Sequence, residues 1–180
     1  MTGTAAPATP VPLMVGDSLR PLVQIRPVDP HDADELAGFY ARLSPESLRR
    51  RFMCMASGIG ADQSRRLCTP DHEHREGFVA VLRTRDARDG LVCGHLCLEP
   101  ASHDSVEIAI AVSDQFQGQG IGRRLFEAAL DWALVHHVRV LVATAFADNT
   151  RVLRLLSSAP KGAEIQPAEA GLVDIEIPVG

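Results

Sequence analysis

The stretch that decides the fold is "SDQFQGQGIGRRLF", residues 113–126. It follows "SVEIAIAV" (105–112), whose alternating pattern predicts a strand, and it leads into an apolar-periodic segment that predicts a long helix. Gly118, Gly120 and Gly122 therefore lie at the corner between the strand and the helix. A helix N-terminus carries about four unpaired N–H groups and a partial positive charge, and residues without side chains let an anion approach closely. The corner therefore predicts a site for a phosphate or pyrophosphate.

The spacing of the corner excludes two common phosphate motifs. A Walker loop needs a lysine, and this stretch contains none. The dinucleotide fingerprint would place its last glycine on Arg123 or on Leu125, depending on which glycine starts the count. The spacing that fits is Gln-x-x-Gly-x-Gly, formed by Gln117, Gly120 and Gly122.

This motif resembles the signature of the GNAT acyltransferase superfamily, Arg/Gln-x-x-Gly-x-Gly/Ala, which binds the pyrophosphate of acetyl-CoA. The block "VEIAIAVSDQFQGQGIGRRLFEAALDWA" (106–133) matches it position by position, and residues 25–52 resemble the first strand and helices of bacterial GNAT protein-lysine acetyltransferases. The resemblance covers about residues 22–165. It implies acetyl-CoA as co-substrate, with no metal. The cofactor-binding residues that it implies are Val112, Gln117, Gly118, Gln119, Gly120, Ile121, Gly122, Arg123 and Asn149.

Two of these residues have particular roles in the resemblance. Val112 ends its strand, where the backbone would pair with the pantetheine arm, and Asn149 matches an asparagine that contacts the cofactor. Many members carry a tyrosine seven residues after this asparagine that can protonate the leaving thiolate. Leu156 stands there in this chain, so a tyrosine acid is not available at that position.

Acyl transfer to an amine also requires a general base. Period-two alternation places Glu107 on the same strand face as two alanines, which leave room above them. Glu107 and Val112 are five residues apart, roughly 17 Å along a strand, which is about the reach of an extended pantetheine arm. The resemblance also implies a strand glutamate as base. We therefore predict Glu107 as the catalytic base, with Glu99 and Asp104 as reserve candidates.

The predicted function is transfer of an acetyl group from acetyl-CoA to a primary amine, with protein lysine as the favoured acceptor. One alternative is acetylation of a small-molecule amine such as a polyamine or an antibiotic. The other is a catalytically silent acyl-CoA-binding regulatory domain. An acidic chain suits either cationic acceptor, so the charge does not choose between the two enzymes.

Composition and motifs argue against several other classes of protein. The net charge is −5 with a pI of about 5.8, which argues against a nucleic-acid partner. No apolar run approaches a membrane span, and residues 1–20, rich in Ala, Pro and Thr, predict a flexible tail and not a signal peptide. The four cysteines form no Cys-x-x-Cys pair, so we expect reduced thiols, a cytoplasmic location and no metal site; "DHEHREG" (71–77) is interpreted as a polar loop.

Residues 21–180 are expected to form a single α/β (α+β) domain with a mixed, mostly antiparallel sheet of about six to seven strands and helices on both faces. The last strand could offer an edge for a second copy, making a homodimer. Cys93 and Cys97 are expected on one strand face, His95 could face the acceptor groove, and residues 49–51 (Arg-Arg-Arg) are interpreted as a solvated face. The predicted strands are 22–28, 77–84, 90–99, 105–113, 139–147 and 171–179, and the predicted helices are 29–43, 44–53, 61–69, 122–138 and 149–158.

Overall fold

The computed structural model describes residues 23–83, 90–102 and 104–180, so the tail predicted at 1–20 lies outside the described residues, as does the connection between the strands predicted at 77–84 and 90–99. The described chain forms one seven-stranded sheet in the order β1-β2-β3-β4-β5-β7-β6. The strands are β1 (Val23–Pro27), β2 (Glu76–Leu82), β3 (Leu91–Pro100), β4 (Ser105–Val112), β5 (Val140–Phe146), β6 (Glu164–Pro167) and β7 (Leu172–Pro178).

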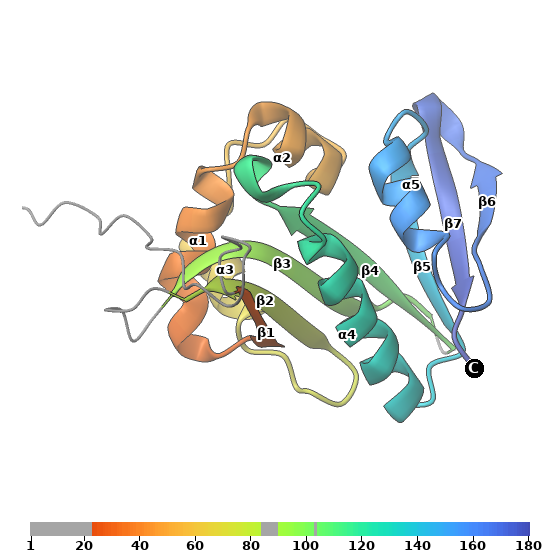
Figure 1. Ribbon diagram of the computed structural model, residues 1–180, viewed down its shortest axis with the longest axis horizontal. Helices are drawn as coiled ribbons and strands as arrows, with labels where there is room; N and C mark the ends of the chain where they lie inside the picture. Colours follow the sequence, from red (N-terminus) through yellow and green to blue (C-terminus); the bar gives the residue numbers. More distant parts are fainter. Residues whose placement is uncertain (1–22, 84–89, 103) are drawn as a thin grey trace, which may run out of the picture.

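The helices cover both faces of this sheet. They are α1 (Ala33–Ala41), α2 (Pro45–Phe52), α3 (Ala61–Leu67), α4 (Ile121–Val135) and α5 (Thr150–Leu156), with short 3-10 turns η1 (Pro30–Asp32), η2 (Asp114–Phe116) and η3 (Glu169–Gly171). One apolar core lies beneath α4 and α5, and the other lies beneath α1, α2 and α3 (Figure 1). The mixed, mostly antiparallel sheet with two helical layers is the predicted fold class. Within the described residues, no helix is both long and apolar enough to cross a membrane.

The strands β4 and β5 form the only parallel pair among the described strands, and they separate along their length. Their pairing covers three positions, from Ser105 opposite Val140 to Glu107 opposite Val142. Beyond this point the two strands diverge, as Figure 1 shows, while β4 stays paired with β3 as far as Val112. The divergence leaves one backbone edge of β4 without a neighbouring strand in the middle of the sheet.

The sequence did not predict β6, and this changes the expected edge of the sheet. All four residues of β6 are exposed, so their sequence carries no buried alternation that would indicate a strand. Because β6 pairs with β7, the last strand is internal to the sheet, and the edges of the described sheet are β1 and β6. The prediction that the last strand offers a free edge is therefore wrong.

A β-bulge also corrects the predicted faces of β3. Ala80 pairs with Gly94 and the next residue of β2 pairs with Val92, so Cys93 is an extra residue without a partner position. The extra residue reverses the alternation of the strand. Cys93 consequently packs in the core under α4, whereas Cys97 packs in the core under α1, on opposite faces and not on one face as expected.

Candidate active site

A cleft of about 790 Å³ opens where β4 and β5 separate. One wall is β4 from Glu107 to Val112, and the other includes Ala143, Thr144 and Ala145 of β5. Residues of α2, α5 and the glycine corner before α4 complete the lining. The cleft therefore runs along β4 from the glycine corner at one end to Glu107 at the other.

The glycines of the corner serve two different purposes. Gly118 and Gly120 have φ angles of 76° and 84°, a left-handed conformation that costs other residues free energy, and a Cβ on either would point into open space. Gly122 lies inside the first turn of α4, where a Cβ would be 3.5 Å from Leu155 and 3.8 Å from Ile110. The first two glycines thus shape the turn and keep its mouth open, whereas the third lies where α4 packs on β4 and α5, with room for a Cβ at ordinary van der Waals distances.

The N-terminus of α4 suits an anion. Arg124 N donates to Gly120 O at 3.1 Å as α4 begins, so the N–H groups before Arg124 lack helical acceptors. The first turn contains no acidic residue that would neutralise the helix dipole. Arg123, Arg151 and Arg154 also line the cleft. The residues present therefore fit a pyrophosphate group with further phosphate nearby.

Asp114 fixes the corner to α2. Its carboxylate accepts hydrogen bonds from Ser44 N at 2.9 Å, Ser44 Oγ at 2.7 Å and Ser47 Oγ at 2.7 Å. Although partial burial would raise it, these hydrogen bonds hold the pKa of Asp114 below its ordinary value. The corner is therefore held in place by hydrogen bonds to the N-terminus of α2.

Gln117, predicted to bind the cofactor, uses its side chain within the protein. Its Nε2 donates to Val112 O at 3.1 Å and to Ser47 Oγ at 3.2 Å, and its Oε1 accepts from Arg151 Nη1 at 2.8 Å. The side chain thus joins β4, α2 and α5 around the corner. Of the other predicted residues here, Ile121 is buried beneath the corner and Gln119 is exposed, donating to Gln115 O.

The open edge of β4 presents backbone groups to the cleft. Ser113 N donates to Cys93 O at 2.9 Å, so the odd-numbered residues of β4 direct their N–H and C=O groups toward β3. Because these directions alternate along a strand, Ile110 and Val112 direct theirs into the cleft. An extended ligand lying along β4 could pair with this edge.

Asn149 lines the same cleft at the start of α5. Its Oδ1 accepts from Val152 N and from Arg50 Nη1, both at 3.4 Å, so it caps α5 and links it to α2. Leu156, which stands where the resemblance would place a tyrosine acid, is buried at the end of α5. Asn149 and Gln117 together tie the two walls of the cleft at its glycine end.

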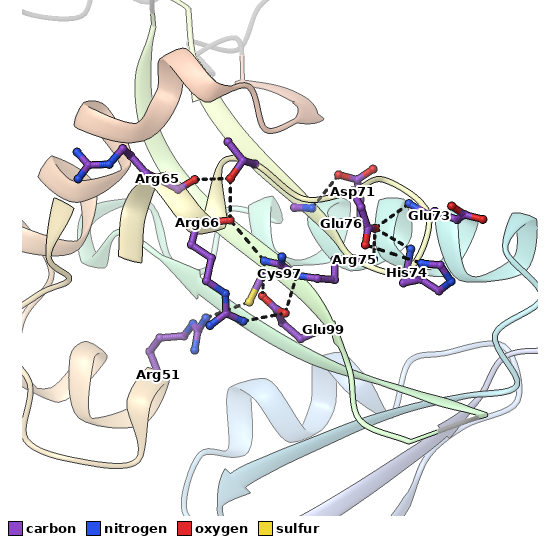
Figure 2. A network of polar contacts seen from close by, with 12 residues as sticks. Arg51, Arg65, Arg66, Asp71, Glu73, His74, Arg75, Glu76, Cys97 and Glu99 are labelled. Atoms are coloured by element: carbon purple, nitrogen blue, oxygen red, sulfur yellow. Dashed lines mark hydrogen bonds and ion pairs between the residues drawn. The ribbon is translucent and has the colours of Figure 1, made fainter. Parts of the chain in front are cut away.

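Glu107 is exposed at the opposite end of the cleft, where β4 and β5 begin to pair. No residue in the described ranges forms a hydrogen bond or an ion pair with its carboxylate. The reserve candidates differ: Glu99, directly opposite on β3, is held by Arg75 at 2.8 Å and Arg66 at 3.1 Å (Figure 2), and Asp104 lies 3.8 Å from Arg139, away from the cleft lining. Glu107 is thus the free carboxylate of the three.

The three arginines of α2 do not form a solvated face, which corrects the sequence interpretation. The Arg49 guanidinium lies 4.0 Å from the centre of the Phe146 ring, a cation–π contact across to β5. Arg50 pairs with Glu46 and reaches Asn149. Arg51 turns toward the sheet, and its Nη2 contacts Cys97 Sγ at 3.1 Å (Figure 2).

His95 does not face the acceptor groove, since its side chain is fully buried outside the cleft lining. Its Nδ1 is 2.9 Å from the Tyr40 hydroxyl of α1. Burial, helped by the nearby Arg51 charge, lowers the pKa of His95 to about 3. The imidazole is therefore a neutral structural group at physiological pH.

This burial predicts a pH-dependent stability. The pKa of His95 is near 6.5 in the unfolded chain and about 3 in the folded chain. Between these two pH values the unfolded state therefore binds one more proton than the folded state. The free energy of unfolding should therefore fall by about 1.4 kcal/mol per pH unit as the pH drops below 6.5. Urea unfolding at pH 7, 6 and 5 measures the slope. His95→Gln, which keeps an acceptor for Tyr40, should remove the contribution of His95 to this slope. Equal slopes in the wild type and the variant would contradict the proposal that the burial of His95 causes the pH dependence.

No metal centre is built by the residues with described positions, where no group of three or more His, Cys, Asp or Glu side chains could hold an ion. In the "DHEHREG" segment, His72 Nδ1 instead lies 3.0 Å from the Glu76 carboxylate. Asp71 accepts hydrogen bonds from the N–H groups of Arg75, His74 and Glu73, which lower its pKa to about 2. These contacts are those of a structured polar loop.

A split parallel pair of strands beside a glycine corner that fits an anion has the geometry to hold a long, phosphate-bearing ligand along an open strand edge. Residues 46–158 match the model of the acetyltransferase (GNAT) family. The match spans more than half of the chain, so the protein belongs to this family and is an acetyl-CoA-dependent N-acetyltransferase.

Solved structures show the same fold. The GNAT domain of S. lividans PAT is 24% identical, with a TM-score of 0.75, 87% of this chain covered and 90% of that one. A phosphinothricin acetyltransferase from Sinorhizobium meliloti, in complex with acetyl-CoA, is 18% identical with a TM-score of 0.69, covering 88% and 89%. A ribosomal-protein-alanine N-acetyltransferase from Brucella melitensis is 21% identical with a TM-score of 0.67, covering 86% and 99%.

Proposed function

We propose that this enzyme transfers an acetyl group from acetyl-CoA to the side-chain amine of a protein lysine, with Glu107 as general base. The observation that carries the proposal is the position of Glu107, an exposed carboxylate with no ion-pair partner among the described residues, at the end of the cleft opposite the glycine corner. A co-substrate whose pyrophosphate lay at the corner would extend along β4 toward it. The acceptor amine would then meet the acetyl group beside this carboxylate.

In the proposed reaction, acetyl-CoA supplies an activated thioester. The acceptor attacks as a neutral amine, and the Glu107 carboxylate takes the proton that the nitrogen must lose, directly or through a water molecule. The new N–C bond forms as the C–S bond breaks, and the departing sulfur takes up a proton. Backbone N–H groups of β4 that face the cleft, such as that of Ile110, would stabilise negative charge on the carbonyl oxygen.

For the co-substrate we propose contacts at the corner by the backbone of Gly118, Gly120 and Gly122. Arg123 and the open edge at Val112 would extend these contacts on either side of the corner. Gln119 and Ile121 would contribute only through their backbone, given where their side chains lie. Gln117 and Asn149 would act mainly by holding the walls of the cleft, since their side chains already have partners in the protein.

Protein lysine is favoured as acceptor because residues 25–52 resemble the lysine-acetyltransferase branch. A small-molecule amine is the second candidate, and the similarity in fold to a phosphinothricin acetyltransferase favours keeping it. Thiol release from acetyl-CoA, measured with lysine peptides, polyamines and aminoglycosides, separates the two. Tight CoA binding without acceptor-dependent thiol release would instead identify a silent acyl-CoA-binding domain.

Binding of CoA should be visible without any acceptor. At a concentration 100 times the Kd, a ligand that binds only the folded state adds about 2.7 kcal/mol to the free energy of unfolding. We therefore expect CoA and acetyl-CoA to raise the melting temperature clearly. 3′-Dephospho-CoA should raise it less, because it lacks the 3′-phosphate that the arginines lining the cleft would contact. A melting temperature that no CoA compound changes would contradict both the enzyme and the silent-domain proposals.

A further inference from the structure

Arg51 occupies an unusual position at the floor of the cleft. It lies in the last turn of α2 and lines the cleft together with Phe52 and Glu107. Its Nη2 contacts the Cys97 thiol, and its guanidinium carbon lies 4.9 Å from the centre of the Phe52 ring. Its Nε is buried and has no hydrogen-bond partner among the described residues. The guanidinium is thus held in place mainly by neutral groups.

The charge of Arg51 has no counter-ion in the described part of the chain. Its neighbour Tyr40 stays neutral because burial raises the pKa of the phenol to about 12. Cys97 also stays neutral because burial raises the pKa of its thiol. Glu107 is close enough to interact electrostatically with Arg51, but the two form no ion pair. Four arginines near it in α2 and beside β3 are paired with carboxylates: Arg49 and Arg50 with Glu46, and Arg66 and Arg75 with Glu99.

Such an arrangement is costly for a folded protein. A partly desolvated guanidinium without a counter-ion is destabilising, and an apolar side chain of similar shape is often neutral or stabilising in its place. Stability therefore gives no reason for arginine at position 51. An anion arriving with a ligand would supply the missing counter-ion.

We propose that Arg51 binds a carboxylate that the acceptor carries close to its reactive amine. Cys97, which Arg51 contacts, pairs with Ala109, and Ala109 is two residues from Glu107 on the same face of β4. Two strand residues span about 7 Å, so a positive group and a negative group lie side by side at this end of the cleft. Glu107 would receive the amine, and Arg51 would receive the carboxylate. This assignment rests on the proposed function.

Two sources of the carboxylate are distinguished by matched acceptors. Free lysine is compared with lysinamide, and a peptide with glutamate on both sides of its lysine is compared with the same peptide carrying glutamine. Charge-assisted hydrogen bonds are strong enough for the carboxylate member of one pair to be favoured at least about tenfold in kcat/KM. The pair that shows the preference identifies the source, and equal rates within both pairs would overturn the proposal.

Variants at position 51 then test whether Arg51 causes the preference for the carboxylate-bearing acceptor. Arg51→Met should abolish it, mostly through the acceptor KM, and should leave the acetyl-CoA KM within about twofold. Its melting temperature should equal or exceed that of the wild type, since the charge it removes has no counter-ion within the described ranges. Arg51→Lys should retain part of the preference. Arg66→Met, which removes a nearby positive charge outside the cleft lining, should retain nearly all of it.

Binding measurements keep this test independent of turnover. With CoA present, the acetylated carboxylate member of one pair should bind wild type at least about tenfold more tightly than its matched partner, and Arg51→Met should bind the two equally. The two pairs are Nε-acetyllysine with Nε-acetyllysinamide, and the lysine-acetylated peptide with flanking glutamates with its glutamine counterpart. If no acceptor releases thiol, the proposed transfer fails, yet this binding difference still decides the role of Arg51. A preference that survives in Arg51→Met, or that Arg66→Met loses to the same extent, would overturn the proposal.

Discussion

Glu107→Gln should lower kcat by roughly 10²- to 10⁴-fold at neutral pH, the range typical of losing a general base. The amide has nearly the same shape as the carboxylate but cannot accept the proton that the attacking amine must lose. Glu107 lies at the end of the cleft opposite the glycine corner, so the Kd for CoA should change by less than about twofold. Thiol release measures the first quantity, and calorimetric titration with CoA measures the second.

Two matched carboxylates serve as controls for this prediction. Glu99 faces Glu107 across the β3–β4 pair but is already bound by Arg75 and Arg66 (Figure 2), and Asp104 lies outside the cleft lining. Glu99→Gln and Asp104→Asn should each reduce kcat far less than Glu107→Gln. Unchanged turnover in Glu107→Gln would rule out Glu107 as the base. An equal loss in Glu99→Gln would move that role to the neighbouring strand.

The features that the sequence predicted correctly are those that a local pattern determines. Alternation of large and small residues from Val106 to Val112 identified β4 and the face on which Glu107 lies. The glycine spacing identified the corner, because only residues without a Cβ adopt the left-handed turn easily while leaving its mouth open. Both signals arise within a few residues of the feature that they predict.

The features that the sequence missed depend on contacts between distant segments. In the Arg-Arg-Arg run nothing local shows that Arg51 packs against Cys97, since its environment comes from Tyr40 on α1 and Cys97 on β3. The bulge at Cys93 depends on the register of β3 against β2, and β6 forms because β7 offers an edge. A single sequence shows the periods of helices and strands but not how strands align with one another. The position of Arg51, the bulge at Cys93 and strand β6 could therefore be recognised only in the folded structure.

Gly120→Val should weaken CoA binding by at least about 100-fold, or about 2.7 kcal/mol. Gly120 has a φ of 84°, which a β-branched residue adopts only with strain, so the substitution would force the turn out of shape. Open space surrounds the position of its Cβ, at the mouth of the corner. The isopropyl group would therefore occupy the space through which an anion must approach the N–H groups of α4.

Gly122→Ala is the matched control, because Gly122 belongs to the same motif but lies in the first turn of α4 and not at the mouth of the corner. Its new methyl group would meet Leu155 at 3.5 Å and Ile110 at 3.8 Å, which are ordinary van der Waals distances, and alanine favours the helix by about 1 kcal/mol over glycine. CoA affinity should stay within about threefold, and the melting temperature should hold or rise. Calorimetry with CoA and thermal melts of both variants provide the comparison. Equal losses of affinity would mean that the corner acts through helix packing alone, whereas a loss confined to Gly120→Val would place the anion against the backbone of the turn.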